Sequence, residues 1–254
     1  MDDLMRKLPI GIQTFEDIRR KNYLYVDKTA LVWRMANLGK PYFLSRPRRF
    51  GKSLLLSTFK AYFQGKKELF EGLAIEKLET EWNEYPVLHL DLNAEKYDKP
   101  EKLKEILSSH LTQWEIQYGK GMDENTLSRR FEGIIRRAYE QTGSQVAVLI
   151  DEYDKPLLQA ISQPKLLDDY RQTLKAFYGV LKSADPYLHF VLLTGVTKFS
   201  QVSVFSDLNQ LNDISLDYSY ATLCGITRKE LTTTFEPEIA AFGQRNQQSP
   251  EEVV

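Results

Sequence analysis

The chain has 254 residues, a formal net charge of −1 and 42% hydrophobic residues. This length allows one large domain or two small ones, and the near-zero charge gives no global field that would attract nucleic acid or an acidic membrane. One cysteine, Cys224, excludes an internal disulfide and a metal site built from several cysteines. The N-terminus lacks an apolar signal core and no apolar run reaches about 18 residues, so we expect a cytoplasmic protein without a membrane span.

The first half of the chain predicts strands and helices separated by glycine or proline. An N-terminal segment over 8–26 leads into a helical pattern that Gly39 ends, as a glycine after a helix should. Pro86 opens a strand in which His89 and Asp91 alternate with apolar neighbours, which indicates a half-exposed strand face rather than a metal site. The predicted strands span 41–44 and 86–92, and the predicted helices span 27–37, 52–63, 100–118 and 123–141.

The second half continues this alternation. Strands are predicted over 146–150 and 188–194 and near 210–216, with a helix over 165–183. Thr227 and Glu230 form a capping box that opens a further helix, which Pro237 should end or bend. Strands that alternate with helices predict an α/β fold, in which a parallel, doubly wound sheet of about five strands is flanked by helices.

The strongest functional motif is a phosphate-binding loop. Gly51-Lys52-Ser53 lies between the apolar strand 41–44 and the apolar start of the helix 52–63, which is the setting of a P-loop. The usual pattern has an earlier glycine where this chain has Arg46, so the motif is only half regular. The alternative interpretation is a basic loop at the end of a strand.

Each residue of this loop has a chemical reason to be there. Gly51 lets the backbone approach a phosphate closely, and Lys52 would reach the β- and γ-phosphates of a nucleotide. Ser53 would offer its hydroxyl to Mg²⁺, which prefers hard oxygen ligands. Arg48 and Arg49 could pair with phosphate oxygens or act as a finger toward a neighbouring subunit. The expected nucleotide-binding residues are Arg48, Phe50, Gly51, Lys52, Ser53 and Leu54.

Two later strands end in polar residues suited to the same site. The apolar strand 146–150 ends in Asp151, placed as a Walker B aspartate for Mg²⁺, and Glu152, placed as the base that polarises the attacking water. The strand 188–194 ends in Thr194, which we predict to contact the γ-phosphate or the water from between the P-loop and Walker B strands. The alternatives are two acids that cap a strand and a threonine that satisfies backbone groups.

These motifs together resemble the bacterial AAA-ATPase-like family. The matching segments are 11–15, 25–29, 46–57, 150–154, 194–200 and 221–227, within a resemblance that covers most of residues 8–242. The resemblance implies a P-loop NTPase of the ASCE/AAA-like kind that binds ATP and Mg²⁺, with Walker roles for Lys52, Ser53, Asp151 and Glu152. This family's motif also lacks the first glycine, so Arg46 marks a subfamily. The family's domain is usually followed by a PD-(D/E)XK nuclease-like domain, whose motif we do not find here.

The resemblance also guides the domain division. We expect residues 1–242 to form the P-loop domain, with 1–40 as an N-terminal linker and helix segment, and 243–254 to form a polar tail or a truncated linker. Related ATPases place the N-terminal linker against adenine, so Ile10, Gly11 or Phe15 would flank the base. The alternative is that this segment packs onto the core as ordinary apolar residues do.

Three functional hypotheses follow. The leading one is a Mg²⁺-dependent ATPase that powers or gates an attached or partner nuclease-like effector, through which any nucleic acid would be met; its catalytic residues would be Glu152, Lys52, Thr194 and Arg49. The second is a nucleotide-binding switch with little hydrolysis. The third is a nucleic-acid-binding module that uses the basic cluster of Arg46, Arg48, Arg49 and Lys52, against which the near-neutral charge argues. The sequence leaves oligomerisation open.

Overall fold

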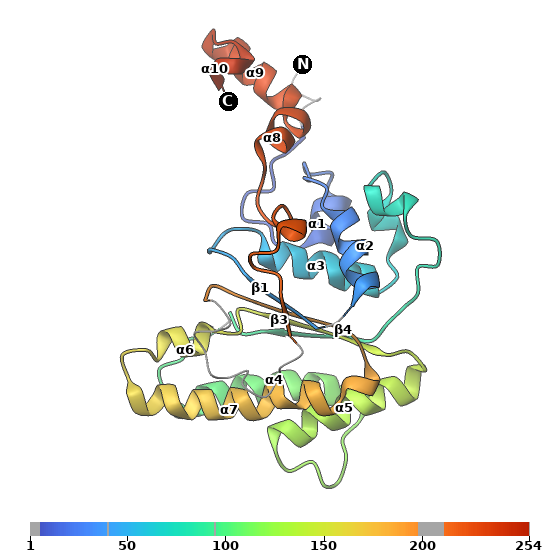
Figure 1. Cartoon of the computed structure of the whole chain (residues 1–254), viewed down its shortest axis with the longest axis vertical. Coiled ribbons are helices and arrows are strands. Elements are labelled where there is room, and N and C mark those ends of the chain that lie inside the picture. Colours follow the sequence, from blue (N-terminus) through green and yellow to red (C-terminus); the bar gives the residue numbers. More distant parts are fainter. Residues whose placement is uncertain (1–5, 40, 94, 198–210, 254) are drawn as a thin grey trace.

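A parallel β-sheet forms the middle layer of the molecule. The structure, a computed structural model, describes residues 6–39, 41–93, 95–197 and 211–253. Within these residues the sheet has five strands in the order β2-β3-β4-β1-β5, and each neighbouring pair is parallel (Figure 1). The strands are β1 (Tyr42–Ser45), β2 (Val87–Asp91), β3 (Val146–Asp151), β4 (Leu188–Gly195) and β5 (Asn212–Asp213). The predicted α/β class is therefore confirmed, and β4 lies between β1 and β3 as the sequence predicted.

The fifth strand is shorter than the stretch near 210–216 that the sequence predicts. It comprises Asn212 and Asp213, and residue 210 lies outside the described residues. The strand ends here because the Asp213 carboxylate accepts the N–H of Ser215, which turns the chain. The Ser215 hydroxyl then accepts the N–H of Ser45, so a side chain replaces the next backbone ladder bond.

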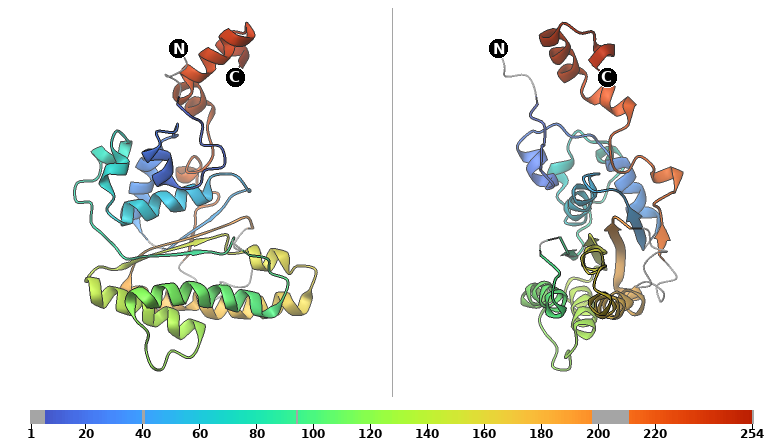
Figure 2. Two further views of the ribbon diagram at one scale, coloured as in Figure 1. Left: turned by 180° about the vertical axis from the view of Figure 1, so that it is seen from behind. Right: turned by 90° about the vertical axis from the view of Figure 1, so that its left-hand side faces the viewer.

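Helices cover both faces of the sheet (Figures 1 and 2). One face carries α1 (Phe15–Arg20), α2 (Thr29–Leu38) and α3 (Lys52–Phe63), and the other carries α4 (Pro100–Tyr118), α5 (Leu127–Thr142), α6 (Lys155–Gln159) and α7 (Pro164–Ser183). Short 3₁₀ turns span Lys67–Phe70, Ala74–Lys77, Asp185–Tyr187 and Tyr218–Tyr220. Helix α5 begins later than the predicted residue 123 because Thr126 is its N-cap, with a side-chain oxygen that accepts the N–H of Arg129.

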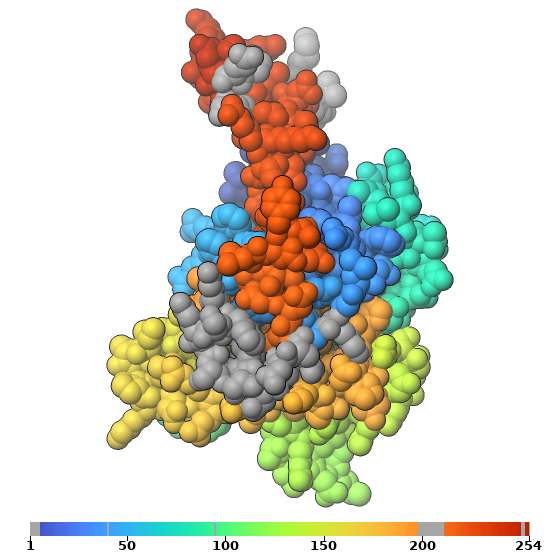
Figure 3. All heavy atoms as spheres, viewed as in Figure 1, coloured from blue at the N-terminus to red at the C-terminus, as the bar shows by residue number. Residues whose placement is uncertain are grey.

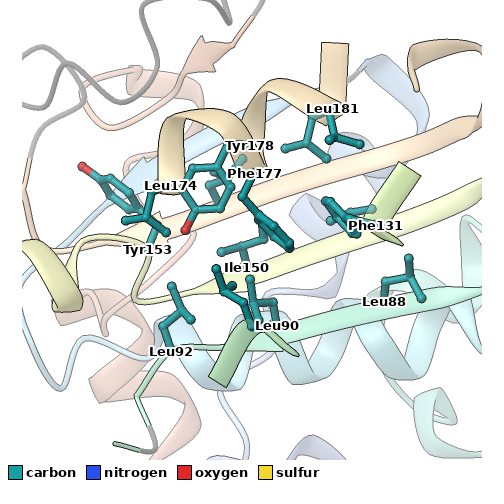
Figure 4. Packing of buried hydrophobic residues seen from close by; sticks show 14 of the residues in the cluster. Leu88, Leu90, Leu92, Phe131, Ile150, Tyr153, Leu174, Phe177, Tyr178 and Leu181 are labelled. Atoms are coloured by element: carbon teal, nitrogen blue, oxygen red, sulfur yellow. The ribbon is translucent and has the colours of Figure 1, made fainter. Parts of the chain in front are cut away.

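The core lies on both sides of the central strands. In β3 the side chains of Val146, Val148 and Ile150 join one buried cluster, while Ala147 and Leu149 join the cluster on the other face. Figure 4 shows the first cluster, in which Ile150 packs with side chains from β2, α5 and α7. This two-sided burial explains why the strand is apolar throughout, and it fixes the position of the acidic residues at its carboxyl end.

The C-terminal residues form an arm that projects from one end of the body (Figure 3). The arm contains α8 (Arg228–Thr234), α9 (Glu236–Asn246) and α10 (Pro250–Val253). The predicted capping box of Thr227 and Glu230 is present, and Pro237 lies in the first turn of α9, so the helix breaks just before it. Residue 242, the expected domain boundary, falls inside α9, and the domain division itself stays a prediction. The described helices include none that is long and apolar enough to cross a bilayer.

Candidate nucleotide site

The predicted P-loop connects β1 to α3. Helix α3 begins at Lys52, directly after Gly51, whose φ of 92° lies in the left-handed region that favours glycine. The first N–H groups of a helix have no partner within it, and they carry the positive end of the helix dipole. The loop therefore presents a suitable site for an anionic group at the start of α3.

Arg46, in place of the usual first glycine, ties the loop to neighbouring segments. Its guanidinium donates to the carbonyl oxygens of Ser45 over 3.0 Å, Ser215 over 2.6 Å and Tyr220 over 3.4 Å. Its backbone N–H donates to the carbonyl of Gly195 in β4 over 3.1 Å. Arg46 thus holds the loop against β4 and the segment after β5, with its charge directed at backbone carbonyls.

Lys52 is the buried cation of the site. It is 3% exposed, and its ammonium donates to the carbonyl oxygens of Arg46 over 3.1 Å and Pro47 over 3.2 Å. Its Nζ also lies 3.1 Å from Glu152 Oε1, an ion pair that joins the two predicted Walker motifs directly. Any anion that takes the ammonium must compete with Glu152 and two carbonyls.

The carboxyl end of β3 places two acids in different environments. Asp151 is 3% exposed and accepts a hydrogen bond of 2.7 Å from the hydroxyl of Thr194, a fully buried residue of β4. Glu152 has a φ of 53°, an unusual value for a residue with a side chain. Burial raises the pKa of the Glu152 carboxyl, and the adjacent Lys52 opposes that rise.

A further acid, Asp154, fixes the turn that follows. Its buried carboxylate accepts the backbone N–H groups of Val196 over 3.0 Å and Thr197 over 2.6 Å, together with the Thr197 hydroxyl. Asp154 belongs to the matching segment 150–154, for which the sequence indicated no role at this position. It clamps the end of β4 to the turn after β3, and so holds Thr194 beside Asp151. Residues 198–200 of the neighbouring motif lie outside the described residues.

An apolar pocket of about 420 Å³ opens on one side of the P-loop. Its walls come from the N-terminal segment, from the first turns of α3 and from the base of the C-terminal arm. Arg49, Phe50, Gly51 and Leu54 reach it from the loop and the helix, and Cys224, Gly225 and Phe235 line it from the arm side. Burial raises the pKa of the Cys224 thiol to about 11, so this side chain acts here as a small apolar group.

A polar pocket of about 380 Å³ lies along the other flank of α3. Ser53 and Asp151 both line it, which brings the two predicted Mg²⁺ residues to one cavity. A hydroxyl and a carboxylate are hard oxygen donors of the kind that Mg²⁺ accepts. The part of the chain that the structure describes contains no group of three or more His, Cys, Asp or Glu residues that could hold a metal by themselves. A Mg²⁺ ion held here would therefore keep several waters and take further oxygen ligands from another group.

The predicted site residues divide into two groups. The structure brings together Lys52 with Glu152, Asp151 with Thr194, and Ser53 with Asp151 in the polar pocket. Arg48 is exposed outside both pockets, while Arg49, Phe50 and Leu54 line the apolar one. Their individual roles stay predictions.

The residues of the N-terminal segment that were predicted to flank a base lie in different environments. Ile10 is 87% exposed and lines the apolar pocket, whereas Phe15 is fully buried against Tyr25 and Phe70 in the core. Phe235 and the residues around Cys224 also line this pocket, and they were not among the predicted site residues. The one available signal for the latter was the matching segment 221–227.

Comparisons with known proteins identify the family of this chain. A family described as predicted AAA-ATPase matches residues 9–205. An uncharacterised protein in the vnfD 5′ region of Azotobacter chroococcum mcd 1 is 41% identical over 236 residues, which cover 92% of this chain and 46% of that protein. The chain thus spans about half the length of this relative. The comparison with solved structures found no match. The chain belongs to the predicted AAA-ATPase family, whose domain is a nucleotide-binding, ATPase-like one.

Proposed function

We propose that this domain binds ATP with Mg²⁺ and hydrolyses it, and that the cycle powers or gates an attached or partner effector. The observation that carries the proposal is the convergence of Lys52, Glu152, Asp151 and Thr194 at the start of α3. They come from the first turn of α3, from the carboxyl end of β3 and from β4, and two of the contacts between them are direct. A basic loop that merely ended a strand would have no reason to meet the acids of β3.

The two pockets determine the orientation that we propose for the nucleotide. The apolar pocket would take the base and the ribose, because its lining offers Ile10, Leu54 and Phe235 to an aromatic ring. The phosphates would then lie over Gly51 and Lys52, at the N-terminus of α3. The γ-phosphate would reach the side of the polar pocket, where Ser53 and Asp151 lie.

The chain's own residues can carry out hydrolysis by exchanging partners. When phosphates take the ammonium of Lys52, the Glu152 carboxylate is released from its ion pair. Glu152 can then accept a proton from the water that attacks the γ-phosphorus, while ADP leaves. Thr194 holds Asp151 in place throughout, through its 2.7 Å hydrogen bond.

Mg²⁺, when bound, would neutralise charge on the β- and γ-phosphate oxygens. Ser53 and Asp151 would hold it directly or through water. Because both side chains supply oxygen, the donor set favours a hard cation over a soft one.

The test compares two site variants with two exposed controls. Lys52→Ala should weaken ATP binding by about tenfold or more, through the loss of a charge-assisted contact of roughly 1.5–3 kcal/mol. Glu152→Gln should keep binding and lose turnover by at least about 100-fold. Lys182→Ala on α7 and Glu140→Gln on α5 change the same residue types at exposed positions and should alter neither quantity. The assignment is wrong if Lys52→Ala and Glu152→Gln hydrolyse ATP as fast as the unaltered protein.

The second candidate is a nucleotide-binding switch with little hydrolysis. The observation in its favour is the Lys52–Glu152 ion pair. While no nucleotide is bound, this pair keeps Glu152, the proposed base, from acting on a water. Tight ATP binding with negligible turnover in the full-length protein supports the switch, and strong turnover excludes it.

The third hypothesis, a nucleic-acid-binding module, loses half of its basic cluster. The guanidinium of Arg46 donates to backbone carbonyls, and Lys52 is buried. Of the four basic residues, Arg48 and Arg49 are the exposed ones. Two charges give a weak electrostatic contact with a phosphate backbone. A titration with DNA should therefore show no strongly salt-dependent affinity. The nuclease-like effector and any oligomer remain proposals about a longer protein, because this chain matches only 46% of the length of the relative.

A further inference from the structure

The polar pocket contains two side chains that the proposed function does not use. His89 and Asp91 line it from β2, the edge strand next to β3. They lie on the same face of that strand, because side chains two residues apart point the same way. Asp91 is paired in register with Asp151, so the carboxyl ends of the two strands bring two aspartates side by side. From the sequence, both residues were expected only to mark a half-exposed strand face.

Packing alone does not explain why His89 and Asp91 are polar. His89 Nε2 is buried from solvent and has no hydrogen-bond partner among the described residues. An imidazole nitrogen in this position is costly unless something meets it. The Asp91 carboxylate accepts the backbone N–H of Asn93 over 2.7 Å, which fixes its orientation and leaves further lone pairs for other donors.

The size and charge of the pocket favour a hydrated cation. A volume of about 380 Å³ exceeds that of several waters at about 30 Å³ each. Its lining carries the acids Glu16, Asp91 and Asp151 against the lysines Lys60 and Lys66. Lys66 is paired with Glu16 over 2.6 Å, which leaves two aspartates and one lysine around the rest of the cavity. A phosphate group placed inside this pocket would be repelled by the two aspartates more than it is attracted by the one lysine.

Magnesium in proteins keeps several of its waters, and each bound water is a hydrogen-bond donor that needs an acceptor. We propose that Asp91 and His89 are those acceptors, and that they form an outer shell which positions the waters of a Mg²⁺ ion held at Ser53 and Asp151. This inference rests on the proposed function. It makes β2 a contributor to the metal site and assigns both residues as positioning residues, which touch neither the nucleotide nor the reacting water.

The test measures how nucleotide affinity depends on Mg²⁺. Asp91→Asn removes the charge and keeps an oxygen for the N–H of Asn93, so the strand end should keep its shape. Glu95→Gln is the matched control, because it removes one negative charge from an exposed position on the loop that follows. His89→Leu removes the ring nitrogens at similar volume and keeps the inference testable if Asp91→Asn does not fold. The affinity of a fluorescent ATP analogue is titrated in EDTA and across Mg²⁺ concentrations, and the bound fraction of Mn²⁺ is measured by EPR.

The expected result is a specific loss of metal dependence. In Asp91→Asn the Mg²⁺ concentration that half-saturates the gain in affinity rises by about tenfold or more, as for other outer-shell partners. His89→Leu gives a smaller rise, and Glu95→Gln gives none. The affinity in EDTA stays within about twofold for all three variants, because no contact with the nucleotide is lost.

Four outcomes overturn the inference. Asp91→Asn and His89→Leu that both keep the original Mg²⁺ dependence show that β2 has no part in the metal site. Loss of turnover by Asp91→Asn at saturating Mg²⁺, with an unchanged half-saturating concentration, places Asp91 in the chemistry itself. An equal loss of affinity in EDTA marks a structural effect. If the unaltered protein binds the analogue no better with Mg²⁺, the proposed metal site itself fails, and the outer shell fails with it.

Discussion

Lys52 and Glu152 illustrate how individual residues of this site are held before a nucleotide binds. The ammonium has three donors, and its recorded partners are two loop carbonyls and one carboxylate. Glu152 reaches it from a backbone in the left-handed region, which costs roughly 1–3 kcal/mol for a residue of this type. The turn keeps this strain because the next two residues, Tyr153 and Asp154, are buried and bonded to the end of β4 and the residues that follow it.

Gly51 should tolerate alanine poorly although space is available. Its φ is 92°, and a Cβ placed there would have no atom of the described residues within 4 Å apart from its chain neighbours, so the cost is backbone strain. Gly51→Ala should lower the free energy of unfolding by about 1–2 kcal/mol. Gly179→Ala, inside α7 and equally free of neighbours, should instead raise it by about 0.5–1 kcal/mol. Urea denaturation of both variants checks the pair, and equal effects would contradict this account.

Glu152 should determine the acid side of the pH–rate profile. Burial raises its pKa above the usual value of 4.5, with Lys52 as the opposing influence. A general base must be unprotonated, so kcat/KM should fall as the pH falls through this raised pKa. The profile of the unaltered protein should therefore bend above pH 4.5, and the residual rate of Glu152→Gln should lack that bend. A bend that survives the substitution assigns the base to another residue.

The sequence nominates candidate site residues, but it does not predict the contacts between them. Gly51, Lys52 and Asp151 belong to local motifs, and local motifs can be read from one stretch of chain. The bonds from Arg46 to the carbonyls of Ser215 and Tyr220 join residues about 170 positions apart, and no local pattern encodes them. Phe235 was not predicted as a pocket residue for the same reason. It reaches the apolar pocket because the arm folds back to the N-terminal segment there.

Among the elements, α4 and α5 are joined by an ion pair with little access to water. Arg130 donates to both oxygens of Glu115 over 2.7 and 2.8 Å, and to the Ser108 hydroxyl over 2.7 Å. The two side chains are 12% and 8% exposed. Such a forked contact connects the two helices on the sheet face opposite α3, and so stabilises the layer that supports β2 and β3.

Removing this contact should destabilise the fold. Arg130→Met should lower the free energy of unfolding by about 2–3 kcal/mol, because it leaves a mostly buried carboxylate without its partner. Arg136→Met, which loses an exposed pair of 3.8 Å with Glu140, should cost less than about 0.5 kcal/mol. Chemical denaturation of the two variants makes the comparison, and similar losses for both would contradict the assigned strength.

The same pair should contribute to acid sensitivity. The hydrogen bond from Arg130 holds the pKa of Glu115 below its usual value of 4.5. The stabilisation is therefore complete above pH 4.5 and is lost as the pH falls through the lower folded value. The stability difference between the unaltered protein and Arg130→Met should shrink over that range in denaturation curves. A difference that stays constant below pH 4 would contradict the linkage.

The elements differed in how far sequence could predict them. Strand 146–150 and helix 100–118 were predicted closely, because burial on two faces gives an unbroken apolar run and a half-buried helix gives a clear period. The fifth strand was not, because its end depends on two side-chain hydrogen bonds made by Asp213 and Ser215. The start of α5 likewise depends on the cap at Thr126.

At the scale of the whole molecule, the C-terminal arm is the feature that sequence patterns could not place. The capping box predicted where α8 starts, but not that the arm would return to the N-terminal segment. Arg6 donates to the carbonyl of Thr234 over 2.7 Å, and Lys28 pairs with Glu230 of the capping box. Both contacts lie at the base of the arm, beside the apolar pocket.

The arm should respond to nucleotide binding at its base and not at its tip. The base of the nucleotide would bridge Ile10, Leu54 and Phe235, which belong to three segments distant in sequence. Hydrogen exchange measured with and without an ATP analogue and Mg²⁺ should therefore slow in residues 8–12, 51–55 and 223–235, while α10 and α7 remain unchanged. Bridging segments in this way stabilises the bound state of all of them together.

Phe235→Ala provides the decisive variant for this arrangement. It removes one wall of the pocket without touching the P-loop, and should weaken the analogue's binding about fivefold, or roughly 1 kcal/mol. Exchange should then slow over 51–55 as before, but much less over 223–235. Phe242→Ala in α9, an exposed phenylalanine outside the pocket, is the control and should leave affinity and exchange unaltered. Protection confined to 46–53 in the unaltered protein would show that the nucleotide contacts the loop alone, and that the arm forms no part of its site.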